Sequence, residues 1–296
     1  RQMCIRDSHS GEQLDVTLPE SLSGTISEFQ GVGDGSIMFS VTSYTQPVQY
    51  FSFDFTNNSL ELLWEEAIPG FNPNDYTEIS TNYKSKDGTM VPITYSYKSS
   101  TKLNKNTPIF LYAYGGYNIS IRPSFTPKYV AWLEMGGVLA VANIRGGGEF
   151  GKAWHNAGRL GTKQNVFDDF LYASKFLESN AIGNRKSTVI SGRSNGGLLV
   201  GATLIQNPNY FGAALPAVGV MDMIRFTEFT EGWGWRGDYG YPILSQEDFH
   251  RNIEISPYHQ TKIGVCYSPT LTTTARRDDR VVPSHSYKFT ARQQEY

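Results

Sequence analysis

One serine carries the strongest chemical signal in this sequence. Ser194 lies in the pentapeptide 192–196, Gly-Arg-Ser-Asn-Gly, and a further glycine follows at position 197. An apolar run with β character precedes the pentapeptide and a run with helical character follows it, so Ser194 stands at a strand-to-helix turn. The backbones crowd at such a turn, and small residues on both sides of the serine relieve the crowding. The pattern Gly-x-Ser-x-Gly in this setting predicts a nucleophile elbow with Ser194 as the nucleophile.

A serine nucleophile also needs an oxyanion-binding group and an acid that orients its base. The backbone N–H of Asn195, at the start of the helix, points to where a tetrahedral oxyanion would develop. In α/β-hydrolase folds, where nucleophile elbows of this kind occur, the acid follows the serine along the chain. Asp278 and Asp279 come directly after a predicted strand, and either carboxylate fits. A solvated loop is the alternative interpretation for both.

No histidine occupies the position that this chemistry requires. The chain contains His9, His155, His250, His259 and His285, and only the last of them follows Asp278. His285 is seven residues beyond Asp278 and just behind Pro283, so we interpret it as a residue at the start of the last helix. We therefore expect that the catalytic histidine lies outside these 296 residues, and that the chain is a C-terminally truncated, inactive fragment.

Alternating strands and helices position the serine. Continuous apolar strands are predicted at residues 108–114, 136–144, 187–192, 213–220 and 268–275, and helices at 165–179 and 195–207. This order predicts an α/β fold with a doubly wound, mostly parallel sheet of the α/β-hydrolase type. A hairpin over residues 76–98, turning at Asp87-Gly88, precedes it. Ligands of such sheets bind at the carboxyl ends of the strands, where Ser194 lies.

The N-terminal part is predicted to contain short strands without intervening helices. Residues 24–63 contain short strand-like runs, with a hairpin signal at Asn57-Asn58, and their spacing is that of one β-propeller blade. We interpret residues 1–8, RQMCIRDS, as a sequencing or cloning scar. The predicted division is then the scar, a blade remnant with its linker over residues 9–70, and a catalytic domain, incomplete at its C-terminus, over residues 71–296.

Composition narrows the classes of partner. A net charge of −2 and a pI near 6.3 indicate no binding of nucleic acid or of an anionic membrane. No apolar stretch approaches the roughly 18 residues of a membrane span. Cys4 and Cys266 form neither a disulfide framework nor a metal-type spacing. The glycine-rich run 144–151 lacks the order of a dinucleotide-binding loop, so no cofactor and no metal is expected, and the compartment stays open.

Several stretches together resemble the catalytic domain of the prolyl oligopeptidase family of serine peptidases. They are YAYGGYNIS, GGVLAVANIRGGGEFGKAWH, KQNVFDDF, SNGGLLVGA, VGVMDM, GDYG and DDRVVPSHSYKF. The resemblance covers residues 24–296 and implies an α/β-hydrolase domain covered by a seven-bladed propeller, of which residues 24–63 would be the last blade. Arg193, Arg276-Arg277 and the polar run ARQQEY near the C-terminus depart from the family pattern.

The resemblance also implies roles for individual residues. Ser194 would be the nucleophile and Asp278 the catalytic acid, while the Tyr114 hydroxyl would join the Asn195 amide in the oxyanion hole. Arg280 would bind a substrate carbonyl. The proline-binding pocket would comprise Tyr117, Val220, Trp235, Tyr239 and Val281, with Trp235 stacked on the proline ring. From residue type alone, core packing explains the two valines, a core aromatic explains Tyr114, and a surface position explains Arg280.

The predicted function is therefore that of a serine endopeptidase, a monomer, that cleaves short peptides after proline through an acyl-enzyme. Its partner would be a short proline-containing peptide, with no nucleic acid and no membrane. Two alternatives stay open. One is a non-catalytic α/β-hydrolase-fold binding protein or fragment, and the other is an esterase that uses the same nucleophile elbow.

Overall fold

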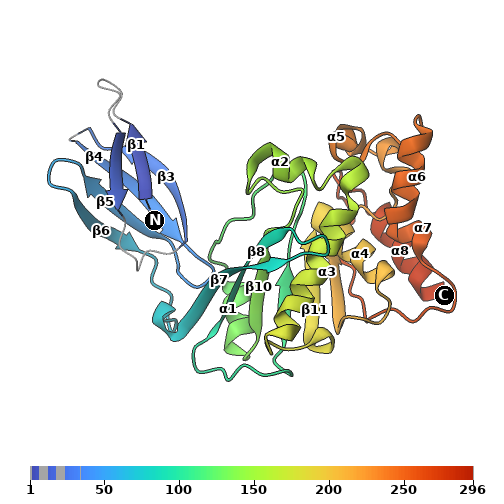
Figure 1. The fold of residues 1–296 in the computed structure, drawn as a ribbon, viewed down its shortest axis with the longest axis horizontal. Helices are drawn as coiled ribbons and strands as arrows, with labels where there is room; N and C mark the ends of the chain where they lie inside the picture. The colour runs from blue at the N-terminus through green and yellow to red at the C-terminus, as the bar shows by residue number, and fades with distance from the viewer. Residues whose placement is uncertain (1, 7–12, 18–23, 34, 296) are drawn as a thin grey trace. The chain divides into compact units, whose positions relative to one another are not determined.

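The chain forms two compact units, which are described separately (Figure 1). The computed structural model describes residues 2–6, 13–17, 24–33 and 35–295. The first unit comprises Arg1–Glu78 and Arg122–Ala131, and the second comprises Ile79–Ile121 and Trp132–Tyr296. The predicted domain boundary after residue 70 and the predicted scar both stay predictions, and residues 1, 7 and 8 of the scar lie outside the described residues.

The first unit contains a four-stranded antiparallel sheet, as the sequence predicts for this region. The strands pair in chain order, β3 (Thr25–Gly31), β4 (Ser36–Thr42), β5 (Gln49–Asp54) and β6 (Ser59–Glu65). Alternate residues of the two central strands form a small core, which consists of Phe39, Val41, Phe51 and Phe53. The predicted turn joins β5 to β6, where Asn58 has φ 53°. A separate antiparallel pair is formed by β1 (Gln2–Arg6) and β2 (Gln13–Thr17).

The second unit is built on a mixed six-stranded sheet with the order β12-β11-β9-β10-β8-β7. The strands are β7 (Tyr76–Lys84), β8 (Met90–Lys98), β9 (Ile109–Tyr112), β10 (Val138–Ala142), β11 (Thr188–Arg193) and β12 (Ala213–Ala217). β9 is parallel to β10 and to β11, and β11 is parallel to β12, whereas β8 runs antiparallel to β10. The predicted doubly wound, mostly parallel sheet is thereby confirmed.

The strand predicted over residues 268–275 is wrong as a continuous element. Only two isolated parallel bridges, at Thr270 and Thr273, join this segment to β12. Hydrogen bonds of a parallel ladder are present on both sides of Pro216, with Leu271 N–H donating to Ala214 O at 2.9 Å and Thr273 N–H donating to Pro216 O at 3.1 Å. Pro216 has no N–H to donate, so the ladder has a gap at this residue.

Eight α-helices accompany the strands in the described residues. They are α1 (Pro127–Glu134), α2 (Gly151–Asn156), α3 (Gln164–Ser179), α4 (Asn195–Gln206), α5 (Arg236–Tyr239), α6 (Gln246–Ile255), α7 (Pro257–Gln260) and α8 (Ser284–Glu295). Short 3₁₀ turns are η1 (Pro73–Asp75), η2 (Leu160–Thr162), η3 (Arg185–Ser187), η4 (Phe226–Glu228) and η5 (Gly232–Trp235). None of the described helices combines the length and the apolar composition that a membrane crossing requires.

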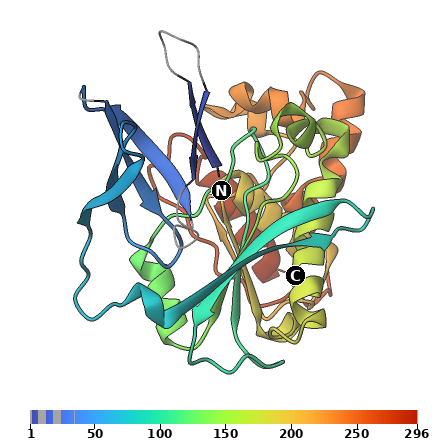
Figure 2. The same cartoon turned by 60° about the vertical axis from the view of Figure 1, so that its left-hand side comes forward.

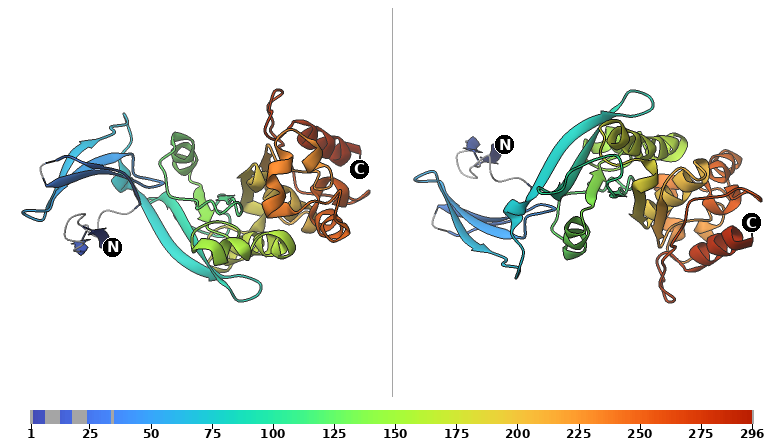
Figure 3. Two further views of the ribbon diagram at one scale, coloured as in Figure 1. Left: turned by 90° about the horizontal axis from the view of Figure 1, so that it is seen from above. Right: turned by 90° about the horizontal axis from the view of Figure 1, so that it is seen from below.

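The helix that follows Ser194 is the central helix of the second unit. All residues of α4 from Asn195 to Ile205 are buried, which explains why it is apolar on every face. α3 packs against α4, and α7 packs against both α4 and α8. Figures 2 and 3 show that α6, α7 and α8 gather near the β12 end of the sheet. The carboxyl end of β11, and with it Ser194, therefore leads directly into a buried helix.

Candidate active site

Ser194 occupies a strained turn between β11 and α4. Its backbone has φ 58° and ψ −117°, a conformation that residues other than glycine rarely adopt. The turn is held from both sides. The Ser194 N–H donates to Ala217 O at 2.9 Å, and the Ser194 carbonyl accepts from the N–H groups of Gly197 at 2.8 Å and Leu198 at 3.1 Å. The end of β12 and the first turn of α4 thus hold the backbone of Ser194 in this turn.

The glycines around Ser194 are required by close backbone approaches. A Cβ on Gly192 would lie 2.2 Å from the Gly196 carbonyl oxygen, and a Cβ on Gly196 would lie 2.9 Å from the Ala113 oxygen. A Cβ on Gly197 would lie 2.5 Å from the Gly219 Cα. Because these neighbours are backbone atoms, a side chain at any of the three positions would push strands and helix apart.

We expect Gly197→Ala to lower the free energy of unfolding by about 1–3 kcal/mol, the usual cost of overpacking a tight contact. Denaturant unfolding of the purified chain measures the change. Gly237→Ala is the matched control, since a Cβ on Gly237 meets no atom within 4 Å. Equal stability of the two variants would contradict the steric explanation.

Two hydrogen-bond donors lie next to Ser194. Asn195 begins α4, so its backbone N–H has no partner within the helix. Tyr114 follows β9 and is half-buried. Burial is the main cause that raises the pKa of the Tyr114 hydroxyl, and its side-chain hydrogen bond with Ser194 acts in the opposite direction. The hydroxyl therefore stays protonated at neutral pH and can donate to an oxygen next to Ser194.

The loop that contains Asp278, the predicted acid, forms a tight turn. The Asp278 carboxylate accepts from the N–H groups of Arg280 at 3.1 Å and Val281 at 2.9 Å. The positive charge of Arg280 lowers the pKa values of Tyr114 and Tyr117, although burial raises both overall. Arg280 is exposed, and its charge acts on both tyrosine hydroxyls. Within the described residues, no hydrogen bond joins Asp278 or Asp279 to Ser194 or to a histidine.

The aromatic residues predicted for the proline pocket come together. The Tyr117 and Tyr239 rings meet edge to face at 5.7 Å. Phe226, which the sequence analysis did not select, stacks on Trp235 at 6.4 Å and meets Tyr239 edge to face at 5.4 Å. Val220 and Val281 are buried in the same hydrophobic cluster. This cluster is also the core of the whole unit, so membership in it does not by itself separate pocket lining from core packing.

The described histidines have other partners than Ser194. His155 Nε2 lies 2.9 Å from Asp238 Oδ1, and His259 Nδ1 lies 2.8 Å from Ser256 Oγ. The exposed His250 contacts a neighbouring ring, and His9 lies outside the described residues. Hence none of the three described here hydrogen bonds to Ser194.

His285 is a buried residue in the first turn of α8. Its Nδ1 accepts a hydrogen bond from the Asp222 N–H at 3.1 Å, and its ring meets Phe229 edge to face at 5.0 Å. Burial lowers the pKa of His285 to about 4, so the ring is neutral at pH 7. The position matches the prediction of a residue at the helix start.

Sequence reasoning missed two buried charged residues, Asp238 and Lys163, that hydrogen bond to segments next to Ser194. Asp238 is buried; one carboxylate oxygen accepts from the Tyr117 N–H at 2.8 Å and the other contacts His155. This pair holds Tyr117 at φ 56°. Lys163 is also buried and hydrogen bonds to Gly115 O and to the Asn195 side chain. Both lie in the stretches GDYG and KQNVFDDF, but no spacing rule shows that these charges are buried.

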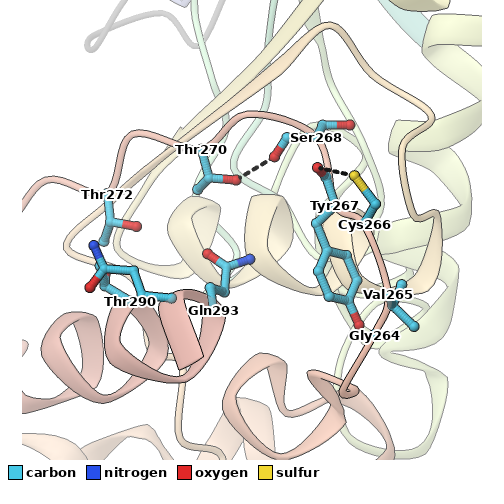
Figure 4. Close-up of a pocket in the computed structure, with 10 residues that line it drawn as sticks. Gly264, Val265, Cys266, Tyr267, Ser268, Thr270, Thr272, Thr290 and Gln293 are labelled. Carbon is cyan, nitrogen blue, oxygen red and sulfur yellow. Dashed lines mark hydrogen bonds between the residues drawn. The ribbon is translucent and has the colours of Figure 1, made fainter. Parts of the chain in front are cut away.

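A cavity of about 510 Å³ lies elsewhere in the second unit, between residues 264–272 and α8 (Figure 4). Thr270, Thr272, Thr290 and Gln293 line it with uncharged polar groups. The exposed Cys266 also borders it. None of the predicted site residues lines this cavity, so it is separate from the surroundings of Ser194.

Comparison with known proteins places these features in a family context. A model described as the prolyl oligopeptidase family matches residues 123–295. A prolyl endopeptidase of Elizabethkingia meningoseptica is 43% identical over 275 residues, which are 93% of this chain and 39% of the relative. A prolyl endopeptidase of Dictyostelium discoideum is 39% identical over 272 residues, 87% of this chain and 36% of the relative. The chain thus spans about two fifths of the length of these relatives.

Solved structures of such proteins have the same fold. One structure, from a study of two prolyl endopeptidases, superposes with a TM-score of 0.91 at 40% identity and covers 99% of this chain and 43% of that protein. Prolyl oligopeptidase B of Galerina marginata, bound to a 35-residue substrate, superposes with a TM-score of 0.90 at 35% identity and covers 96% of this chain and 40% of that protein.

Proposed function

Because the chain belongs to the prolyl oligopeptidase family, we propose that it forms part of a serine peptidase that cleaves short peptides on the carboxyl side of proline. The observation that carries this proposal is the strained Ser194 at the end of β11, with the Tyr114 hydroxyl beside it. Such a turn costs free energy and is kept where a nucleophile must stand clear of its neighbours.

In the proposed reaction, the Ser194 hydroxyl attacks the carbonyl carbon of the proline residue while a base takes its proton. The carbonyl oxygen becomes an oxyanion, which accepts hydrogen bonds from the Asn195 N–H and the Tyr114 hydroxyl. Collapse of this intermediate breaks the C–N bond, and the protonated base gives its proton to the leaving amine. Water then hydrolyses the acyl-enzyme in the same way and restores the Ser194 hydroxyl.

The base in this proposal is a histidine outside the 296 residues. What supports this is that His155, His259 and His285 each hydrogen bond to groups other than Ser194. Asp278 would orient the base, with its carboxylate held by the turn at Arg280 and Val281. Arg280, which is exposed and whose charge acts on the Tyr114 hydroxyl, would bind a substrate carbonyl. The proposed partner is a short proline-containing peptide, and the enzyme is proposed to act as a monomer.

The proposed specificity depends on the aromatic group around Trp235. A proline ring is compact and apolar, lacks a peptide N–H and can pack against the face of an indole. Trp235 is nearly buried against Phe226, and Tyr239 and Tyr117 continue the aromatic surface. With Val220 and Val281, these side chains would accept an apolar ring and would offer no carboxylate to a lysine or arginine side chain.

In the full-length enzyme, Trp235→Ala should lower kcat/KM for a Gly-Pro amide by about tenfold or more relative to a simple acyl ester. Stacking on an aromatic face contributes about 0.5–1.5 kcal/mol beyond the buried area, and the lost burial adds to it. Trp233→Ala is the matched control, because Trp233 lies in the same 3₁₀ turn with its side chain 60% exposed. Equal losses for amide and ester would remove Trp235 from the pocket.

The same assay tests the proposed activity itself. The enzyme should hydrolyse the Gly-Pro amide, and Ser194→Ala should abolish this turnover. Hydrolysis of the ester alone would favour an esterase. The absence of both activities in the full-length protein would favour a non-catalytic binding protein.

A further inference from the structure

Lys163 is a buried cation in the second unit that the proposed reaction does not use. It directly precedes α3 and is 3% exposed. Its Nζ donates to Gly115 O at 3.0 Å and to Asn195 Oδ1 at 3.0 Å, and it lies 5.4 Å from the centre of the Tyr239 ring. Among the described residues, no carboxylate lies within ion-pair distance of it. A buried cation without such a partner reduces stability, so packing does not explain this lysine.

The Asn195 side chain is the point where Lys163 meets the site. Asn195 Nδ2 donates to Tyr114 O, and Asn195 Oδ1 accepts from both Lys163 Nζ and the Tyr239 hydroxyl, the latter at 2.8 Å. The segment after β9, the start of α3 and the short α5 therefore meet on a single side chain. A Cβ on Gly116 would lie 2.6 Å from Asn195 Nδ2, so this approach needs a glycine there.

These contacts connect the two donors next to Ser194. The side chain of Asn195 is anchored to the backbone of Tyr114, and the backbone of Asn195 supplies the other donor. Lys163 bridges the same two segments one residue further on, because it binds both Asn195 Oδ1 and Gly115 O. An oxyanion hole is effective only when its donors are fixed before the reaction.

We propose that Lys163 is a positioning residue, which holds the Asn195 side chain and the Gly115 carbonyl so that the Asn195 N–H and the Tyr114 hydroxyl converge on one oxyanion. This role rests on the proposed function. Lys163 touches neither the substrate nor the reacting atoms and acts through Asn195. Burial lowers the pKa of Lys163 to about 8 and Asp238 acts in the opposite direction, so the ammonium group keeps all its donors at neutral pH.

The test compares Lys163→Met and Lys163→Gln in the full-length enzyme, with Lys175→Met on the exposed face of α3 as the matched control. Lys163→Met should lower kcat for a Gly-Pro amide about ten- to hundredfold, as expected for losing hydrogen bonds to a charged group, and should change KM by less than about threefold. Lys163→Gln, which keeps a donor, should recover part of kcat. Lys175→Met should behave as the wild type.

Inhibitor binding supplies a second measurement. A peptide ending in prolinal forms a tetrahedral adduct with the serine, and its affinity should fall in proportion to kcat in Lys163→Met. A peptide ending in proline carboxylic acid resembles the product, and its affinity should stay within about threefold. If Lys163→Met does not fold, the comparison uses Lys163→Gln, for which a smaller loss of kcat and of prolinal affinity is expected.

Three results would overturn the role of Lys163: an unchanged kcat in both variants, equal losses of affinity for the two inhibitors, or no recovery in Lys163→Gln relative to Lys163→Met. Failure of the proposed function has a different signature, since the wild-type enzyme itself would then not hydrolyse the Gly-Pro amide. The two failures are therefore distinguishable in one series of assays.

Discussion

The 296-residue chain by itself is expected to hydrolyse a Gly-Pro amide about 10⁶-fold more slowly than the full-length enzyme, which is the loss that follows removal of a triad histidine in a serine protease. A serine hydroxyl is not deprotonated at neutral pH without a positioned base. His155, His259 and His285 each hydrogen bond elsewhere. Binding and oxyanion stabilisation alone supply only about 10³–10⁴ over the reaction in water.

The measurement compares turnover by the 296-residue chain, by the full-length enzyme and by Ser194→Ala in each. We expect Ser194→Ala to abolish turnover in the full-length enzyme and to change little in the shorter chain. If the shorter chain instead reaches within tenfold of the full-length enzyme and loses this activity in Ser194→Ala, the base lies inside it. His285→Gln would then identify whether the base is the buried histidine of α8.

Tyr114→Phe in the full-length enzyme should lower kcat by about 10²–10³, the usual effect of removing one oxyanion donor. The phenyl ring keeps the packing and removes only the hydroxyl. Because burial raises the pKa of this hydroxyl, it is protonated throughout the neutral range, and the loss should be the same across this range. KM should change little, since the oxyanion exists only in the transition state and the tetrahedral intermediate.

Steady-state kinetics with the Gly-Pro amide from pH 6 to 8 measure this effect. Tyr112→Phe is the control, because Tyr112 is a half-buried tyrosine in β9. Burial raises the pKa of its hydroxyl as it does for Tyr114. It should keep kcat within about threefold. A loss below threefold in Tyr114→Phe, or a loss seen only in KM, would exclude the Tyr114 hydroxyl from the oxyanion hole.

Local patterns were sufficient for most of the scaffold. The continuous apolar runs that end near Tyr112, Ala142 and Arg193 became parallel strands, because a strand that is covered on both faces excludes polar residues. The one predicted strand that failed, residues 268–275, depends on its partner. Its ladder is interrupted by Pro216, which lies more than fifty residues earlier in the chain, and a scan of the segment alone does not include it.

The elbow at Ser194 was predictable from local sequence. Ser194 and its glycines are neighbours in the chain, and the steric demand of a strand-to-helix turn is a local property that glycine spacing reports directly. The aromatic residues predicted for the pocket were selected only through the resemblance of the chain to a family. Residue type does not separate a pocket wall from a packed core, so the assignment of these residues to a pocket stays a prediction.

The polar side chains around the elbow come together through long-range contacts of the fold. Asn195 contacts Tyr114, Lys163 and Tyr239, and these contacts span 81, 32 and 44 residues of sequence. Asp238 reaches Tyr117 across 121 residues. Hydrophobic periodicity carries no information about such contacts, because it counts every lysine as a polar residue, whether the side chain is buried or exposed. The difference between them arises when β9, α3, α4 and α5 meet at one end of the sheet.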